Sequence, residues 1–224
     1  SQSRYAKMAN TGIDAVHWTN GFWGERFNVF SGTSLQSMWN TWNTPEVSHG
    51  FRNFEIAAGV CKGEHWGPPF HDGDMYKWME GVASVYAVNK DPELDKLMDN
   101  FIACVVKAQR ADGYIHTPVV IEELNKGIDS HTLADSQQQT VIGTKVGSED
   151  EKGAFANRLN FETYNLGHLM MAGIVHHRAT GKTTLLDAAV KATDFLCHFY
   201  ETASAELARN AICLLYTSDA ADDK

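Results

Sequence analysis

The chain has 224 residues, of which 43% are hydrophobic and 21% charged, so it can form a packed core and is not broadly disordered. Its formal net charge of −9 argues against the concentrated basic face that nucleic acids and anionic membranes require. We therefore expect no nucleic-acid partner and no membrane partner, and a neutral, hydroxyl-rich substrate fits this charge at least as well as a charged one.

The first part of the chain is predicted to be an irregular arm over residues 1–33, because Gly, Asn and Thr are frequent there. Helices are expected around 34–42 and 50–62, followed by a loop, GEHWGPPFHDGD, whose glycines and prolines forbid regular structure. Aromatic residues are compatible with a carbohydrate cleft, but core packing is the more common role for any one of them. They gather at Trp18, Phe22, Trp23, Trp39, Trp42, Trp66 and Phe70.

A helical hairpin is predicted next. Apolar residues recur at helical spacing over 74–89 and again over 92–110. Between the two helices, Asp91 is the expected N-cap and Pro92 occupies the first helical position, where its missing N–H is not needed. The segment then ends in the turn ADGY, where Asp112 is interpreted as a turn residue rather than a ligand contact.

A second hairpin of the same kind is predicted over 160–202. Gly181 suits the left-handed position after the first helix, and Thr183 or Thr184 can cap the next one. Two such hairpins indicate an all-α toroid built by stacking, with the first helix of each, rich in Gly, Ala and Met, on the inner wall. The long connection 117–158 is interpreted as a lid or a disordered segment, with a short strand pair as an option inside it.

The strongest candidate site is the run from Phe70 to Trp78. Asp72 and Asp74 lie two residues apart at the start of a helix, where carboxylates stay ionised and can accept hydrogen bonds from sugar hydroxyls. The competing interpretation is that one of them only caps the helix. As an acid/base pair they are less convincing, because glycosidase carboxylates come from separate elements.

Other residues are weighed in the same way. The second inner helix carries Glu162 and His168, and the pair His176 and His177 follows. Without a carboxylate at i, i+4, these histidines are expected to be hydrogen-bonded helix residues rather than metal ligands. The four cysteines, Cys61, Cys104, Cys197 and Cys213, show no zinc-binding spacing, and Cys104 and Cys197 are expected to be buried thiols.

Several motifs in this order resemble glycoside hydrolase family 127, the β-L-arabinofuranosidase-like proteins, over roughly 13–213. They are GFWGERF at 21–27, NFEIAAG at 53–59, F-x-D-x-D-x-Y-K-W at 70–78, Q-x-x-DGY at 109–114 and Y-N-x-GHL at 164–169. The resemblance implies an (α/α)6 barrel followed by β-sandwich domains. It also implies a cysteine nucleophile held on zinc by Cys and Glu ligands and a Glu acid/base, all downstream of position 213.

None of the four cysteines lies in a matching motif, so no catalytic residue and no metal ligand is assigned here. Zinc is expected in the full-length enzyme and not in this fragment. What carries over is the sugar-binding wall, and its candidates are Trp66, His71, Asp72, Asp74, Glu162, Tyr164 and His168. The family's His before Glu162 is Phe161 in this chain, which removes a donor and leaves open a related furanose or branched pectic sugar.

The sequence thus predicts residues 34–213 to be a partial (α/α)6 catalytic domain and 214–224 to be a non-native tail. About seven helices make roughly half of the ring, so an apolar inner face is expected to be exposed and the isolated chain to self-associate and be inactive. The proposed substrates are L-arabinofuranosyl or related pectic sugars. The alternative is a non-catalytic carbohydrate-binding or scaffold module.

Overall fold

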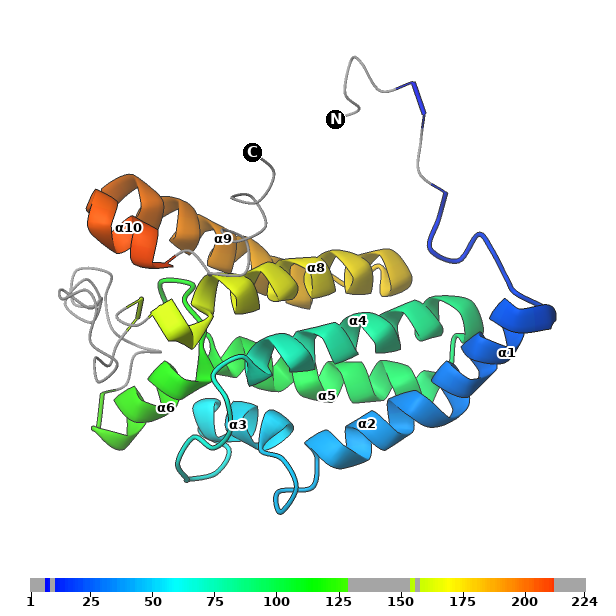
Figure 1. Ribbon diagram of the computed structural model, residues 1–224, viewed down its shortest axis with the longest axis horizontal. Coiled ribbons are helices and arrows are strands. Elements are labelled where there is room, and N and C mark those ends of the chain that lie inside the picture. Colours follow the sequence, from blue (N-terminus) through cyan, green and yellow to red (C-terminus); the bar gives the residue numbers. More distant parts are fainter. Residues whose placement is uncertain (1–6, 9–10, 129–153, 156–157, 212–224) are drawn as a thin grey trace, which may run out of the picture.

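The computed structural model describes residues 7–8, 11–128, 154–155 and 158–211 (Figure 1). The predicted tail 214–224 and most of the connection before the second hairpin lie outside these ranges. The regular elements within them are helical: α1 (Gly21–Val29), a π-helical turn (Phe30–Ser34), α2 (Leu35–Trp42), α3 (Gly50–Ala57), α4 (His71–Asn89), α5 (Pro92–Ala108), α6 (Thr117–Asn125), a 3-10 turn (Arg158–Asn160), α8 (Glu162–Thr180), α9 (Thr184–Thr202) and α10 (Ala205–Ala211).

The first hairpin, α4–α5, is built as predicted. Lys90 ends α4 in the left-handed conformation, with φ 54°. Asp91 then caps α5, because its Oδ1 accepts a 2.9 Å hydrogen bond from the backbone N–H of Glu93. α4 begins earlier than expected, at His71, so both Asp72 and Asp74 lie in its first turn.

The second hairpin, α8–α9, also follows the prediction. Gly181 ends α8 with φ 79°, the conformation that glycine adopts without strain. Thr183 occupies the N-cap position of α9, but its side chain makes no capping hydrogen bond.

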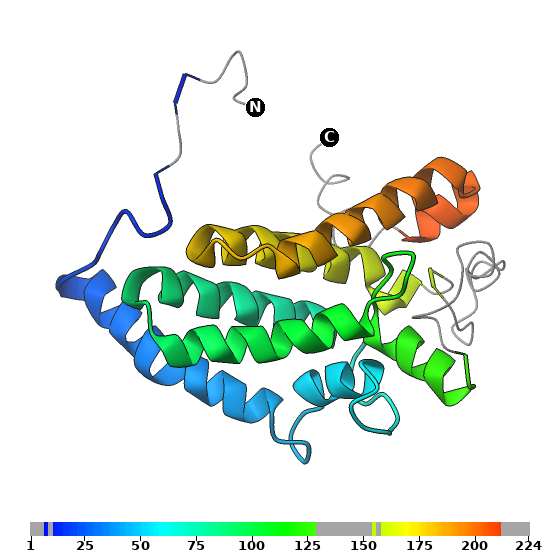
Figure 2. The same ribbon diagram turned by 180° about the vertical axis from the view of Figure 1, so that it is seen from behind.

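The two hairpins stack side by side. α4 packs along α8 and forms one layer with it. α5 and α9 form a second layer on one side of this pair, so α9 lies behind α8 in Figure 1 and in front of it in Figure 2. α4 and α8 run in the same direction, so their N-terminal ends meet at one end of the molecule, close to α3 and α6 (Figure 1). This is the predicted stacking of helical hairpins, with the first helix of each hairpin in one layer.

The prediction of an irregular arm up to residue 33 is wrong from residue 21 onward. The irregular part ends at Asn20, and α1 runs through the π-helical turn into α2. The turn places the Phe30 ring against α4, where a Cβ on Gly81 would lie 3.0 Å from it. This contact joins residues about fifty positions apart, so the local sequence does not reveal it.

The stretch after Tyr114 also differs from the prediction, because residues 117–125 form α6 instead of a strand or a loop. Pro118 stands near the start of α6, where it suits a helix, and the first backbone N–H of the helix is bonded by a side chain from α4, described below.

The core lies between α3, α4 and α5, where Phe54, Trp78 and Phe101 are all buried. Trp39 stacks on Trp78 with 4.9 Å between ring centroids, so the packing interpretation holds for this aromatic. A second aromatic group, Tyr114, Phe155, Phe195 and Phe199, joins the turn after α5 to α9. By contrast, Trp18, Phe22 and Trp23 are more than half exposed.

None of the helices in the described ranges is both long enough and apolar enough to cross a membrane.

Candidate functional site

The N-terminal ends of α4 and α8 are locked together by Asn165, which is buried. Its Oδ1 accepts a 2.9 Å hydrogen bond from the Gly73 backbone N–H, and its Nδ2 donates to the Pro69 carbonyl at 2.9 Å. A Cβ at position 73 would lie 2.7 Å from that oxygen and 3.0 Å from the Tyr164 ring. Gly73 is therefore required for this close approach of the two helices.

Asp72 is 1% exposed, and protein donors bind both of its oxygens. Thr117 donates its backbone N–H to Oδ2 at 2.7 Å and its hydroxyl to Oδ1 at 2.6 Å, so Asp72 caps α6 rather than its own helix. His116 Nδ1 lies 3.5 Å from Oδ2. Burial by itself would raise the pKa of Asp72, but the contacts from His116 and Thr117 outweigh burial and lower it, so the carboxylate is ionised.

Glu162, at the start of α8, is a second buried carboxylate. The Tyr114 hydroxyl donates to Oε1, and the Phe155 backbone N–H lies 2.9 and 3.0 Å from the two carboxylate oxygens. Burial raises the pKa of Glu162, and this effect outweighs the lowering by the His116 charge and by these hydrogen bonds. Glu162 therefore fixes the start of α8 onto the turn after α5.

An ion-paired arginine supports the same turn. The Arg110 side chain is fully buried and donates to Asp112 at 2.6 Å and to Glu123 at 3.0 Å. Its guanidinium also lies 4.8 Å from the centre of the Tyr114 ring. Asp112 is thus part of the turn, as the sequence indicated, and Arg110 ties the end of α5 to α6.

Four histidines from four segments surround Asp72, and we call them the histidine cluster: His49, His65, His71 and His116. The charges of Asp72 and of the other three members act on His65. Burial is the largest effect on His65 and lowers its pKa from 6.5 to about 4. Burial likewise lowers the pKa of His71, so both rings are neutral at pH 7.

Each ring of the histidine cluster keeps one buried nitrogen that has no hydrogen-bond partner among the described residues. These atoms are His49 Nδ1, His65 Nε2, His71 Nδ1 and His116 Nε2. The nearby Trp42 Nε1 is in the same state, and its ring packs edge-on against His71 at 5.7 Å. A buried polar atom without a partner costs about 1–3 kcal/mol, so a group of five indicates a place where water or a ligand binds.

His116 shows how the cluster is oriented. Its Nδ1 lies 3.5 Å from the Asp72 carboxylate and 3.4 Å from Asn165 Nδ2. The carboxylate favours a proton on Nδ1, a tautomer that we infer from the hydrogen bonds, and Nε2 is then an acceptor in the neutral ring. In this tautomer Asp72 positions His116, and Asn165 Nδ2 lies beside the ring without bonding to it.

Lys77 joins two of the predicted site residues, Asp74 and Tyr164, on the face shared by α4 and α8. Its Nζ lies 3.3 Å from Asp74 Oδ1, donates to the Tyr164 hydroxyl and sits over the Tyr164 ring. His168 packs edge-on against Tyr164 at 4.6 Å, and its Nδ1 has no partner among the described residues. Asp74 and Lys77 are partly exposed, so this group can reach a ligand.

Trp66 is half exposed beside the cluster, with His49 packed edge-on against its ring at 4.8 Å. The seven predicted residues thus lie at or near the joined ends of α4 and α8, but in three different states. Asp72 and Glu162 are buried and fully bonded, Asp74 and Tyr164 are linked through Lys77, and Trp66, His71 and His168 keep groups available for a ligand. The predicted sugar contacts themselves stay predictions.

Sequence reasoning missed His49, His65, His116 and Lys77. No motif or spacing connects the three histidines, because they come from the residue before α3, the loop before α4 and the turn before α6. The only local signal was Lys77, which stands one helical turn after Asp74.

Two expectations about helix residues are wrong. His177 is bonded as expected, with Nδ1 3.1 Å from the Lys182 carbonyl, but His176 is fully buried and neither of its ring nitrogens has a partner among the described residues. Cys197 is exposed rather than buried, and Cys104 is half-buried. Cys197 lies on the outward face of α9, which the apolar sequence around it did not reveal.

In the part of the chain that the structure describes, no group of three or more His, Cys, Asp or Glu side chains could hold a metal ion.

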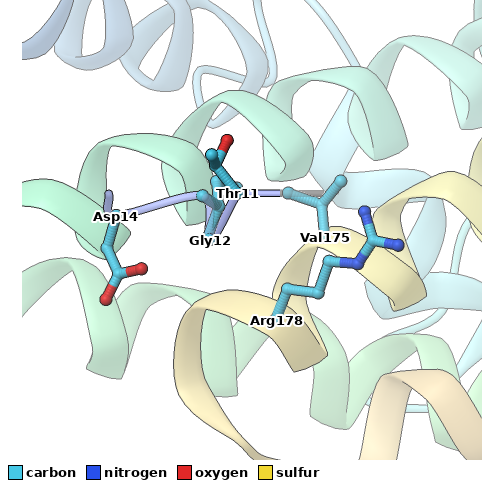
Figure 3. A pocket seen from close by; sticks show the side chains of 6 residues that line it. Thr11, Gly12, Asp14, Val175 and Arg178 are labelled. Carbon is cyan, nitrogen blue, oxygen red and sulfur yellow. The ribbon is translucent and has the colours of Figure 1, made fainter. Parts of the chain in front are cut away.

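A hollow of about 680 Å³ lies elsewhere, between the N-terminal arm and α8. Thr11, Gly12 and Asp14 of the arm and Val175 and Arg178 of α8 line it (Figure 3). Val175 and Arg178 belong to the C-terminal half of α8, so this open hollow is remote from the joined N-terminal ends. Size alone does not make it the functional site.

The chain is similar to known glycoside hydrolases. The profile of the β-L-arabinofuranosidase GH127 catalytic domain matches residues 15–218. The non-reducing end β-L-arabinofuranosidase of Bifidobacterium longum subsp. longum is 32% identical over 149 residues, which are 66% of this chain and 19% of that protein.

Solved structures point the same way. A glycoside hydrolase is 68% identical, with a TM-score of 0.59 over 95% of this chain and 24% of its own. A GH127 β-L-arabinofuranosidase from Geobacillus stearothermophilus T6 is 32% identical, with a TM-score of 0.63, and the match covers 80% of this chain and 25% of that one. A third structure, a GH127 β-arabinofuranosidase, is 26% identical, with a TM-score of 0.64, and the match covers 84% of this chain and 26% of that one.

The chain therefore spans about a fifth to a quarter of the length of these relatives. Their helical barrel-like fold confirms the predicted partial (α/α)6 barrel. With a profile match over most of its length and helical hairpins stacked as in these structures, the chain belongs to the GH127 β-L-arabinofuranosidase catalytic-domain family.

Proposed function

We propose that this chain forms the sugar-binding wall of a longer glycoside hydrolase that releases L-arabinofuranosyl or related plant cell-wall (pectic) sugars. The observation that carries the proposal is the histidine cluster, in a chain that belongs to a family of such enzymes. Its unpartnered nitrogens lie at the joined N-terminal ends of α4 and α8. The nucleophile and the acid/base are proposed to come from the rest of the polypeptide.

Neutral imidazoles suit this task. A sugar hydroxyl both donates and accepts hydrogen bonds, and a neutral ring offers one acceptor or one N–H donor at each free nitrogen. Because burial lowers the pKa of His65 to about 4 and also lowers the pKa of His71 below 6.5, both rings are neutral at pH 7. In this proposal His116 binds the sugar through Nε2, while Asp72 positions it.

The proposal divides the predicted site residues by role. Asp72 and Glu162 hold α6 and α8 in place, because their oxygens already accept protein hydrogen bonds. His71, Asp74, Tyr164, His168 and Trp66 face the ligand, with Lys77 holding Asp74 and Tyr164 together.

The test uses a polypeptide that extends this sequence to the length of its relatives. Sugar release is measured on a panel of β-L-arabinofuranosides and other pectic glycosides. His116→Ala should lower kcat/KM by about 100-fold, because it removes a hydrogen bond and unpairs buried polar groups. His116→Gln, which keeps a nitrogen near the Nε2 position, should lose less. The control, His198→Ala, changes an exposed residue of α9 and should leave the rate unchanged.

Two results would count against the proposal. Absence of any sugar release from the whole panel rejects the hydrolase, and sugar binding without release supports the alternative of a carbohydrate-binding module. Equal rates for His116→Ala and His198→Ala would show that the histidine cluster does not hold the substrate.

Zinc is assigned to none of the described residues, since they offer no ligand set. We propose that zinc is held by the part of the enzyme outside this chain and that the 224-residue chain alone is inactive. Metal analysis should find zinc in the extended polypeptide and none at stoichiometric level in the chain alone. Stoichiometric zinc or sugar release by the chain alone would overturn this assignment.

A further inference from the structure

The loop between α3 and α4 holds Trp66 in a fixed place. The Asn53 side chain, which is fully buried on α3, receives the Trp66 backbone N–H on Oδ1 at 3.3 Å and donates from Nδ2 to the Trp66 carbonyl at 3.0 Å. One side chain thus satisfies both backbone groups of Trp66, as a neighbouring strand would. The backbone at Trp66 is fixed, whereas the indole ring is 50% exposed.

The next residue fits this loop onto the histidine cluster. Gly67 has φ 105°, and a Cβ there would lie 2.6 Å from the His71 ring, so only glycine allows the loop to pack so closely on His71. On the other side, the His49 ring meets the indole edge-on at 4.8 Å. The exposed indole is therefore fixed at the rim of the cluster.

Exposure differs within the site. His116 and Asp72 are 0% and 1% exposed, whereas Trp66 is 50% exposed and is the one nearest the solvent. In a pocket that removes terminal sugars, the terminal sugar enters furthest, and the group to which it is attached stays at the rim. An indole face packs well on the C–H face of a sugar ring, which is apolar.

We infer that Trp66 is the platform for the second sugar, the one from which the terminal sugar is cleaved, with His49 Nδ1 and His65 Nε2 as partners for its hydroxyls. This inference rests on the proposed function. It makes Trp66 a determinant of specificity for glycosides whose leaving group is itself a sugar, as opposed to a small alcohol.

The experiment compares two substrates on the extended polypeptide: a β-L-arabinofuranosyl disaccharide and methyl β-L-arabinofuranoside, which lacks the second sugar. Trp66→Leu removes the aromatic face, whereas Trp66→Phe keeps one. The control is Trp23→Leu, a 64% exposed tryptophan on α1. Trp66→Leu should raise KM for the disaccharide by about tenfold, with kcat little changed, because one well-packed tryptophan contributes that much.

The same variant should change kcat/KM for the methyl glycoside by less than about twofold, and Trp66→Phe should restore most of the disaccharide affinity. Equal losses on both substrates, or no loss on the disaccharide, would overturn the inference while the proposed function stands. If the wild type cleaves neither these two substrates nor any other of the panel, the proposed function fails, and the inference fails with it.

Discussion

The two ends of the α4–α8 pair are built in different ways. At their C-terminal ends both helices finish on a left-handed residue, Lys90 and Gly181, and Lys90 Nζ adds one partly exposed 3.0 Å hydrogen bond to the Ala179 carbonyl, 89 residues away. At their N-terminal ends the N-cap residues are Phe70 and Phe161, and neither side chain caps its helix.

The N-terminal ends are completed by partners far away in sequence. Asn165 of α8 receives the Gly73 N–H, Asp72 of α4 caps α6, and Glu162 accepts from Tyr114. Violations of local rules gather where a protein binds or reacts, because other parts of the chain must stabilise such a place. The contrast teaches that the N-terminal end, where sugar binding is proposed, depends most on hydrogen bonds from partners far away in sequence.

The sharpest test of this contrast removes Arg110, the buried cation at the N-terminal end. Arg110→Ala should lower the free energy of unfolding by about 3–5 kcal/mol, the cost of breaking a buried ion pair. Urea denaturation followed by tryptophan fluorescence measures it. The control is Arg178→Ala, an exposed residue near the other end, expected within about 0.5 kcal/mol of wild type. Similar losses of unfolding free energy in the two variants would contradict the difference between the two ends.

A second prediction compares the stability lost when one hydrogen-bonding side chain is removed at each end of the α4–α8 pair. Asn165→Leu leaves the buried Gly73 N–H and Pro69 carbonyl without this partner and should cost about 1–3 kcal/mol. Lys90→Met loses one partly exposed hydrogen bond to a carbonyl and should cost about 0.5 kcal/mol. The same denaturation experiment measures both. A larger cost for Lys90→Met would reverse the assignment of the two ends.

A third prediction concerns the face between the two ends. On α8, Met171 is 50% exposed and Ile174 is 38% exposed, and apolar residues of this kind drive association. The 224-residue chain should therefore self-associate, and Met171→Glu with Ile174→Glu should weaken the association at least about tenfold. Sedimentation velocity over a concentration series measures this. Val106→Glu, at an equally exposed site on α5, is the control, and a monomeric wild type would contradict the prediction.

The smallest expected effect is the pH dependence from His65. Its pKa is 6.5 in the unfolded chain and about 4 in the folded one, so the unfolded state binds the proton more readily. The stability contributed by the neutral ring is present above pH 6.5 and is lost as the pH falls from 6.5 towards 4. Melting temperatures measured across this window should fall less steeply for His65→Gln than for wild type. His198→Gln, on the exposed side of α9, should follow the wild type.

The parts of the fold that could be predicted are those whose signals are local. Asp91 and Pro92 set the start of α5, and Gly181 sets the end of α8, because a cap or a left-handed residue acts on its own helix. α6 was missed because the side chain that caps it, Asp72, lies 45 residues earlier. The helix at 21–29 was missed because few of its residues are buried.

The same reason explains which residues of the candidate site could be predicted from the sequence. The carboxylates were found because short motifs contain them, and Trp66 because it is an aromatic residue in a Gly- and Pro-rich loop, whereas His49, His65 and His116 stand alone in the sequence. Only the packing of α3, α4 and the turn before α6 brings these histidines around Asp72. The roles of Asp72 and Glu162 needed the structure as well, since a motif does not show whether a carboxylate is already bonded.

The bond between Gly73 and Asn165 spans 92 residues, and this has a consequence for the order of folding. Each hairpin can form from contacts close in sequence, but the first turn of α4 gains its partner only when α8 docks, after a long loop has closed. The binding end should thus be the last part of this region to gain protection from amide exchange, and the Gly73 N–H should report the docking step. A chain with only the first hairpin would have the helices but not the site.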